Sequence, residues 1–162
     1  MNMRSASLMA LGLCAASQTY AQGGPFCAFS IPMPVSGTFT VDTTAGTNWI
    51  GTYGSFASPS NDIMYTFTTR AKPPTGAITP TAANYLFAIY LLSDCSNGGT
   101  QAMPISQTTT VGTPLDLSGA EAAHTYYVAI TGTPAAGAGA NGTLTIDVTP
   151  VLPVTLQSFT VD

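Results

Sequence analysis

Charged side chains are scarce in this sequence. Only 6% of its 162 residues are Asp, Glu, Lys or Arg, whereas an ordinary soluble domain has roughly 25%. Three residues are basic and seven are acidic. Binding to nucleic acid or to an anionic membrane surface needs clustered Lys and Arg, so the composition excludes both functions. A weakly charged surface also repels its neighbours weakly, which favours self-association.

The sequence also has no apolar run long enough to cross a membrane, which takes roughly 20 residues. The run from Ala6 to Ala16 follows Arg4 and precedes Thr19-Tyr20-Ala21, which has small residues at the two positions that a signal peptidase inspects. This order is typical of a cleavable signal peptide. We therefore predict a signal peptide at residues 1–21 and a secreted protein, extracellular or on the cell surface. A buried N-terminal helix and lipid attachment at Cys14 are the alternatives, although Leu13 lies where lipid attachment normally requires a small residue.

Cysteine is rare as well. Cys14 lies in the predicted signal peptide, so processing leaves Cys27 and Cys95. In an oxidising compartment such a pair favours one disulfide. A bridge that closes a loop of this size would stabilise the fold by about 4 kcal/mol in the chain-entropy estimate. Two free thiols are the alternative.

Sustained helical periodicity is absent after residue 21, and period-two alternation replaces it. Three segments alternate apolar residues with threonine or aspartate and predict half-buried strands: 38–42, 62–68 and 143–148. Tyr85–Leu92 is apolar on both faces and Tyr126–Ile130 nearly so, which predicts strands in the middle of a sandwich or under a cover. Weaker strands fit Ala102–Thr110 and Pro114–Leu117.

Clusters of Gly, Pro, Asn and Ser separate these segments and mark turns. Seven to nine short strands with such turns predict an all-β fold, an antiparallel and jelly-roll-like β-sandwich. We expect one domain at residues 22–149, followed by a strand-forming tail at 150–162. Pro150 and Pro153 separate the two, because proline cannot donate a hydrogen bond to a sheet.

The tail carries a strand pattern whose phase slips. Val154 and Leu156 share one parity, whereas Phe159 and Val161 share the other. A bulge or bend between the pairs would reconcile them. Such a strand can pair with the open sheet edge of a neighbouring molecule or complete its own sandwich. The sequence leaves both alternatives open.

Three aromatic residues, Trp49, Tyr53 and Phe56, gather in a Gly- and Ser-rich stretch. Exposed aromatic rings suit stacking on sugars. These residues are therefore candidates for a glycan-binding platform. The alternative is a loop that folds down over one end of the core.

Catalytic and cofactor motifs are absent. His124, the one histidine, has no nucleophile or zinc motif around it, so we predict a turn histidine and no enzyme. We predict no metal site and no cofactor. Calcium would have its best candidate ligands in Asp94 and Asn97, with Asp62 approaching in space, but Asp and Asn in turns usually serve the turn itself.

Several short motifs follow one another in a familiar order: Pro25-Phe26-Cys27-Ala28, Gly37-Thr38-Phe39, Asp62–Phe67, Leu91–Cys95, His124–Val128 and Gly142–Ile146. They resemble the bacterial pre-peptidase C-terminal-like (PPC-like) domain in its cysteine-containing form, over most of residues 25–149. The resemblance implies a jelly-roll-like sandwich without catalytic machinery, of the kind that accompanies secreted proteases, adhesins or glycan-acting enzymes. Leu152–Thr160 resembles the start of a type IX secretion sorting domain, which is either truncated here or used for another purpose.

These observations together predict a non-enzymatic extracellular protein with a structural or adhesive role at the cell surface. It would assemble into a filament or surface layer through its C-terminal strand. The expected partners are further copies of itself, other surface proteins or glycans. A carbohydrate-binding accessory module of a secreted system is the alternative.

Overall fold

The computed structural model describes residues 29–69, 76–94, 101–133 and 141–149. Three sequence predictions fall outside these ranges: the signal peptide at 1–21, the Cys27–Cys95 disulfide, and the tail strand with Val154, Leu156, Phe159 and Val161. They stay predictions. Within the described ranges, no helix has the length and apolar character that crossing a membrane requires.

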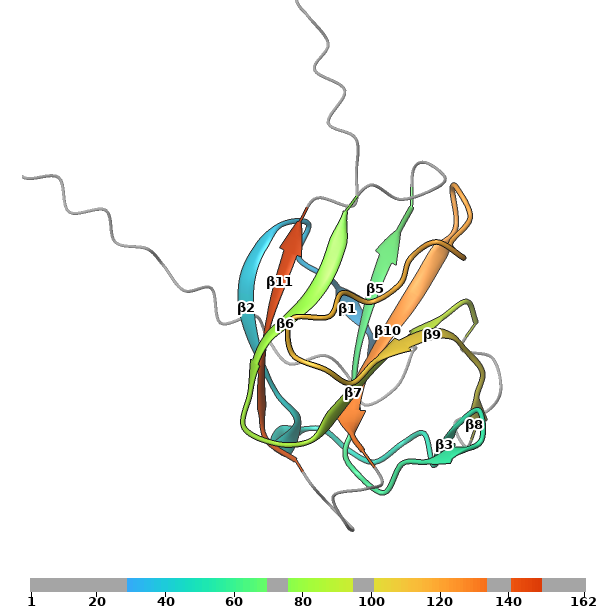
Figure 1. Cartoon of the computed structure of the whole chain (residues 1–162). Helices are drawn as coiled ribbons and strands as arrows, with labels where there is room; N and C mark the ends of the chain where they lie inside the picture. Colours follow the sequence, from blue (N-terminus) through green and yellow to red (C-terminus); the bar gives the residue numbers. More distant parts are fainter. Residues whose placement is uncertain (1–28, 70–75, 95–100, 134–140, 150–162) are drawn as a thin grey trace, which may run out of the picture.

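The described residues form an all-β fold of three sheets (Figure 1). The largest sheet has the order β1 (Ile31–Pro32), β5 (Ile63–Thr68), β10 (Thr125–Gly132), β7 (Phe87–Leu92) and β9 (Pro104–Thr108). The second has the order β2 (Gly37–Asp42), β11 (Thr143–Thr149) and β6 (Ala77–Ala83), and the third β4 (Phe56–Ala57), β3 (Thr52–Tyr53) and β8 (Gln101–Ala102). One short 3₁₀ helix, η2 (Thr43–Ala45), follows β2.

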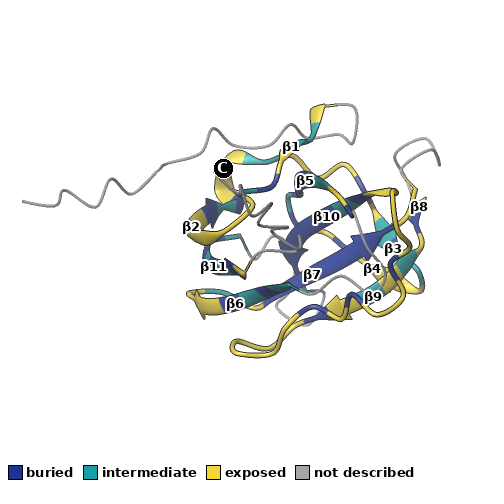
Figure 2. Cartoon of the chain, turned by 90° about the horizontal axis from the view of Figure 1, so that it is seen from above, coloured by how far each residue is buried: buried dark blue, intermediate teal, exposed yellow. Residues whose placement is uncertain are grey.

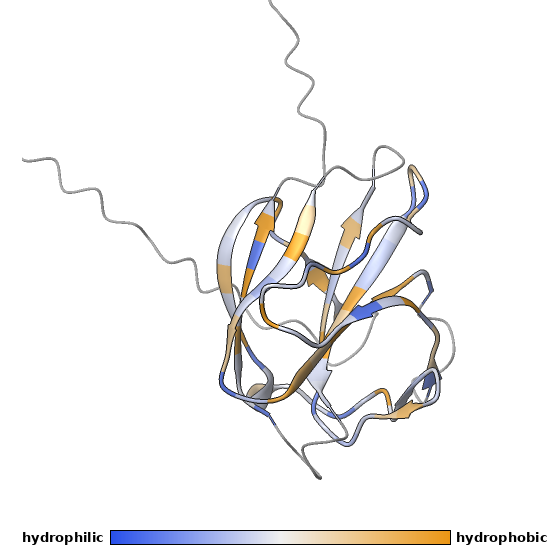
Figure 3. Cartoon of the chain, in the orientation of Figure 1, coloured by the Kyte–Doolittle hydropathy of each residue, from blue (hydrophilic) through white to orange (hydrophobic). Residues whose placement is uncertain are grey.

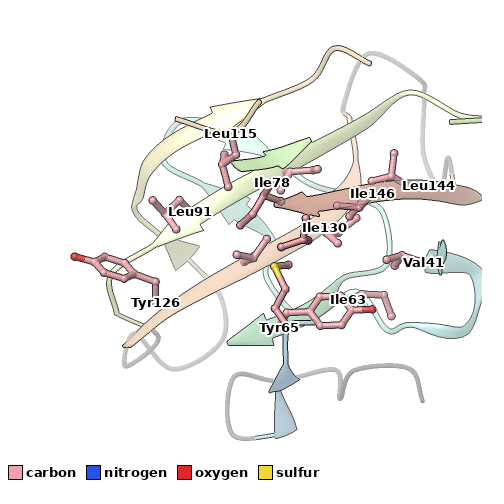
Figure 4. Close-up of a cluster of buried hydrophobic side chains, with 14 of the residues drawn as sticks. Val41, Ile63, Tyr65, Ile78, Leu91, Leu115, Tyr126, Ile130, Leu144 and Ile146 are labelled. Carbon is pink, nitrogen blue, oxygen red and sulfur yellow. The ribbon is translucent and has the colours of Figure 1, made fainter. Parts of the chain in front are cut away.

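The first two of these sheets face each other as a β-sandwich, which confirms the predicted fold class (Figure 2). Pairing is antiparallel except between β1 and β5 and between β3 and β8. Between the sheets lies the inner core, a cluster of buried side chains (Figure 4) that includes Val41, Ile63, Ile78, Leu91, Ile130, Leu144 and Ile146. The seven longer strands agree with the predicted number, and four two-residue strands add to them.

The alternating segments form strands as predicted: β2, β5 and β11. Threonine lines the exposed face of the sheet formed by β2, β11 and β6. There the Thr38 hydroxyl donates to the Asp147 carboxylate at 3.0 Å. Figure 3 shows few strongly hydrophilic segments on the body of the sandwich, which reflects the scarcity of charge.

β6 is a strand that the alternation does not predict, because Pro80 lies inside it. Proline is tolerated at sheet edges and bulges, where its missing N–H is not needed. β6 is the edge of its sheet, and its register with β11 shifts beside Pro80, between Thr145 and Ile146. The position in the sheet therefore makes the proline harmless.

The strand predicted for Pro114–Leu117 is wrong. This segment is a loop, although the side chains of Leu115 and Leu117 are buried in the inner core. The Leu115 N–H donates to the Ile78 carbonyl at 2.9 Å, but no strand pairing follows in the described residues. The alternation in this segment indicates burial and not a strand.

The central strands of the largest sheet, β7 and most of β10, are buried on both faces. Every residue of β7 is buried, as the two-sided apolar pattern predicts. The face away from the inner core carries a second set of buried residues, here called the outer cluster: Ile50, Tyr53, Met64, Ala88, Tyr90, Leu92, Ala102 and Ala129. Residues 47–58, here called the cover loop, contain β3 and β4 and contribute Ile50 and Tyr53 to this cluster. The cover loop and β8 thus form a partial third layer.

Candidate functional site

A buried carboxylate fixes the cover loop to the sheet. Asp62 is fully buried immediately before β5. One of its carboxylate oxygens accepts hydrogen bonds from the backbone N–H groups of Trp49 and Ile50, both at 2.8 Å. The other accepts from the Tyr53 hydroxyl at 2.8 Å. Three donors of the cover loop therefore converge on one side chain.

Further contacts join the loop to the strands beneath it. The Tyr53 ring stacks on Tyr90 of β7, with centroids 4.3 Å apart and an interplanar angle of 8°. The Ser58 hydroxyl hydrogen-bonds the Thr131 hydroxyl of β10 at 2.8 Å. The loop also needs a glycine at its base, because a Cβ atom on Gly46 would lie 2.5 Å from the Asp62 carbonyl oxygen.

Burial raises the pKa of the Asp62 carboxyl above its ordinary value, because a charged carboxylate loses its hydration there. The donated hydrogen bonds act in the opposite direction, since they favour the charged form. The same burial raises the pKa of the Tyr53 hydroxyl, and the nearby carboxylate adds to this effect. The site is therefore electrostatically costly, and hydrogen bonds offset part of that cost.

This geometry corrects one sequence prediction and bears on an alternative that the sequence left open. The alternation of residues 62–68 placed Asp62 on the solvent-facing side of a strand; instead, the cover loop buries it, and both its carboxylate oxygens accept hydrogen bonds from protein donors. The cover loop is the reason for the error at Asp62, because the alternation of residues 62–68 shows which side chains share a strand face and not what packs on that face. For the loop with Tyr53, the sequence left open an exposed platform or a loop that folds down over the core. Tyr53 is completely buried, which agrees with the folded-down loop and prevents this ring from stacking on a sugar from solvent.

Trp49 and Phe56 are the two predicted platform residues that reach solvent. Their side chains are 39% and 50% exposed, respectively. The hydrogen bond from the Trp49 N–H to Asp62 holds the tryptophan backbone in place. The cover loop therefore presents two partly exposed aromatic side chains on an anchored backbone.

His124 lies in the turn before β10. Its Nε2 atom is 3.1 Å from the Ser93 carbonyl oxygen, and its ring packs against Tyr126 at a centroid distance of 4.7 Å. Its backbone N–H and carbonyl both hydrogen-bond Thr69. These contacts connect the turn to the ends of β5 and β7.

No group of three His, Cys, Asp or Glu side chains able to hold a metal ion occurs in the part of the chain that the structure describes. Of the calcium candidates, Asn97 lies outside the described residues. Asp94 lies inside them, just after β7.

An apolar groove of about 240 Å³ opens at the end of the sandwich where β5 and β11 finish. Pro32, Met33, Pro34, Val35, Phe67 and Val148 supply its apolar lining, together with Thr66 and Thr68. Val35 is 66% exposed at its mouth. The groove is smaller than the roughly 300–1,000 Å³ typical of small-molecule sites, and its size suits individual apolar side chains.

Sequence patterns give no direct signal for this groove, because its lining comes from three separate segments of the chain. The repeated proline at positions 32 and 34 is the one local sign, since it ends the pairing of β1. Tertiary structure alone brings Val148 beside Met33 and Phe67.

Comparisons with models of known protein families, with curated proteins and with solved structures found no match to this chain. The resemblance to the PPC-like domain and to a sorting-domain start therefore stays a prediction.

Proposed function

We propose that this chain is a secreted, non-enzymatic surface protein that assembles with further copies of itself through Val154–Val161. The apolar groove is the observation that carries the proposal. Val148 lines it, and Val148 lies only six residues before Val154 in the sequence. A segment with an apolar strand pattern thus begins six residues after a residue that lines an apolar surface of a size suited to such side chains.

Two further features support assembly. The scarcity of charge leaves little electrostatic repulsion between copies. Large apolar side chains also lie exposed on the sandwich, including Val35 at 66% and Leu86 at 58%. Of these, Val35 lines the apolar groove, so its exposed side chain is available to a neighbouring copy there.

The test uses the mature chain, from residue 22 onward, examined by electron microscopy and analytical ultracentrifugation. We expect filaments or oligomers from the natural sequence. The double variant Leu156→Asp/Phe159→Asp should be monomeric, because charges replace the apolar side chains of the segment. Gln157→Asp is the matched control and should still assemble. A natural chain that is monomeric at high concentration would refute self-assembly.

A carbohydrate-binding module is the second candidate, and the exposure of Trp49 and Phe56 on the anchored cover loop favours it. Aromatic faces stack on sugar rings in such sites. This function predicts hits on a glycan array that Trp49→Ala removes. Leu86→Ala, which removes an exposed apolar side chain elsewhere, should keep them. An array without hits would exclude this candidate.

A further inference from the structure

Among the residues that the structure describes, no strand pairs with the outer edge of β2, which we call the open edge. β2 pairs with β11 on one side and is the end of its sheet. The Thr43 N–H donates to the Gly142 carbonyl at 2.9 Å, which shows that odd-numbered residues of this segment direct their backbone groups toward β11. Successive residues of a strand alternate in direction. The backbone N–H and C=O groups of Thr38 and Thr40 therefore point away from the sheet.

The opposite edge of the same sheet is covered. The Gly112 N–H donates to the Pro80 carbonyl at 2.7 Å, and the Leu115 N–H donates to the Ile78 carbonyl at 2.9 Å. These bonds fill the outer edge of β6. In Figure 2, β6 and β9 lie along the lower side of the sandwich, away from β1 and β2.

The edges of the largest sheet are protected in other ways. The hydroxyls of Ser106 and Thr108 on β9 donate to the carbonyls of Asp116 and Thr113 in the loop that covers β6. β1 is only two residues long and contains Pro32, which has no N–H. Short strands and prolines are common protections of sheet edges. In the described part of the chain, β2 has none of these protections at Thr38 and Thr40.

We propose that Val154–Val161 of a second copy adds to the outer edge of β2 and extends the sheet of β2, β11 and β6 by one strand. This inference rests on the proposed self-assembly and names its acceptor. Main-chain hydrogen bonds to Thr38 and Thr40 would hold the added strand, as in other cases of β-strand addition.

The apolar groove supplies the side-chain recognition. Gly37, the first residue of β2, pairs with Val148, which lines the groove. The groove therefore lies beside the first residue of β2, at one end of this strand. The core-facing side of β2 carries Phe39 and Val41, so the added strand would turn either Val154 and Leu156 or Phe159 and Val161 to the same side. Both pairs are apolar and fit that environment.

The prolines favour a second copy over the chain's own tail. Pro150 and Pro153 fix their own φ angles, and each disfavours the helical conformation in the residue before it. Reaching its own β2 edge would require the chain to reverse direction between Thr149 and Val154, because β2 and β11 are antiparallel. Because the prolines disfavour a reversal built on a helical turn, they support a second copy as the occupant of the edge.

The test separates donor from acceptor in the mature chain. Thr40→Pro blocks the β2 edge that would receive the added strand, here called the acceptor edge. It does so because it removes an N–H that faces outward and is not used in pairing with β11. Thr40→Ala is the matched control, since it keeps the N–H. Leu156→Asp/Phe159→Asp silences the donor. Circular dichroism checks that each variant is folded, and Thr38→Pro replaces Thr40→Pro if the latter does not fold.

We expect the acceptor-silenced and donor-silenced chains each to be monomeric alone and to form a 1:1 heterodimer when mixed, measured by ultracentrifugation. Thr40→Ala should assemble like the natural chain. If Thr40→Pro and Thr38→Pro both assemble normally while the donor variant does not, the β2 acceptor is wrong and the proposed function stands.

If the natural chain is monomeric, the proposed function fails, and hydrogen exchange then reports on the edge itself. Amides of Thr38 and Thr40 that are protected in the natural chain and exposed in the donor variant would show that the chain's own tail occupies the edge. That result would overturn the second-copy proposal, and so would unprotected amides in the natural monomer.

Discussion

The two faces of the largest sheet are both buried, but they are covered in different ways. Against the inner face packs a whole second sheet, whose contacts are almost entirely apolar (Figure 4). Over the outer face lies the cover loop, which is held by Asp62 and by Tyr53 stacked on Tyr90. A loop has few side chains with which to bury apolar surface, so directional hydrogen bonds complete the attachment.

This difference teaches that burial alone does not describe how a face is stabilised. The inner core gains stability from area removed from water, which is non-directional. The outer cluster depends in addition on one carboxylate that must be satisfied, because leaving a buried polar group without partners costs about 1–3 kcal/mol. Substitutions can change the buried apolar area and the hydrogen bonds to this carboxylate separately.

The largest effect should come from the inner core. Leu91 and Leu92 are neighbours on β7, both completely buried, and they belong to the inner core and the outer cluster respectively. Leu91→Ala should lower the free energy of unfolding by about 3–5 kcal/mol and Leu92→Ala by about 2–3 kcal/mol, because the thin cover can collapse into a cavity more easily. Denaturant titration of both variants measures the difference. Equal losses would show that the cover is as rigid as a sheet.

Asp62→Ala should come next, with a loss of about 2–4 kcal/mol, because it leaves the Ile50 N–H and the Tyr53 hydroxyl without their acceptor. Asp62→Asn should lose less than about 1 kcal/mol, since the amide oxygen can accept from the backbone and the Tyr53 hydroxyl can turn to accept from the NH₂ group. Thermal and denaturant unfolding compare the two. A similar loss in both variants would mean that the negative charge itself is required.

Tyr53→Phe should have a smaller effect, about 1–2 kcal/mol, because it removes one hydrogen bond to a charged group and keeps the ring on Tyr90. The same substitution in the Asp62→Asn background should cost less, which a double-mutant cycle measures. Strictly additive losses would contradict a direct contribution of this hydrogen bond.

The smallest effect is a dependence on pH. Because burial raises the pKa of Asp62 in the folded protein, the folded state holds its proton more tightly than the unfolded chain, whose Asp pKa is about 3.9. The associated stability is fully present below that value and is lost as pH rises through the raised pKa. Unfolding measured across acidic pH should show this decline in the natural chain and not in Asp62→Asn. Parallel curves would refute it.

The strands illustrate how far local pattern reaches. β2, β5 and β11 follow from alternation, and β7 follows from its two-sided apolar run. β6 does not, because the cost of Pro80 depends on whether its strand is central or at an edge. The segment around Leu115 shows the opposite error: its alternation predicts a strand where the structure has a loop, because the side chains of a buried loop can alternate like those of a strand.

The candidate sites also could be predicted from the sequence only in part. Composition pointed to the cover loop as the place where aromatic residues gather, and Trp49 and Phe56 are indeed partly exposed there. Which of the three aromatic residues faces solvent depends on Tyr90 and Asp62, neither of which belongs to the loop. The groove is lined by segments distant in sequence, and the position of β2 at an edge depends on the order of the strands. Local sequence patterns therefore predict neither.

By itself, the sequence determined an all-β fold with a weakly charged surface, because period-two alternation and composition are properties of each segment alone. Only the tertiary structure decided that Asp62 is buried, that Tyr53 is hidden and that β2 carries an exposed edge. The physical reason is that burial and hydrogen-bond satisfaction depend on what packs against a residue, and those partners are set by the arrangement of the sheets.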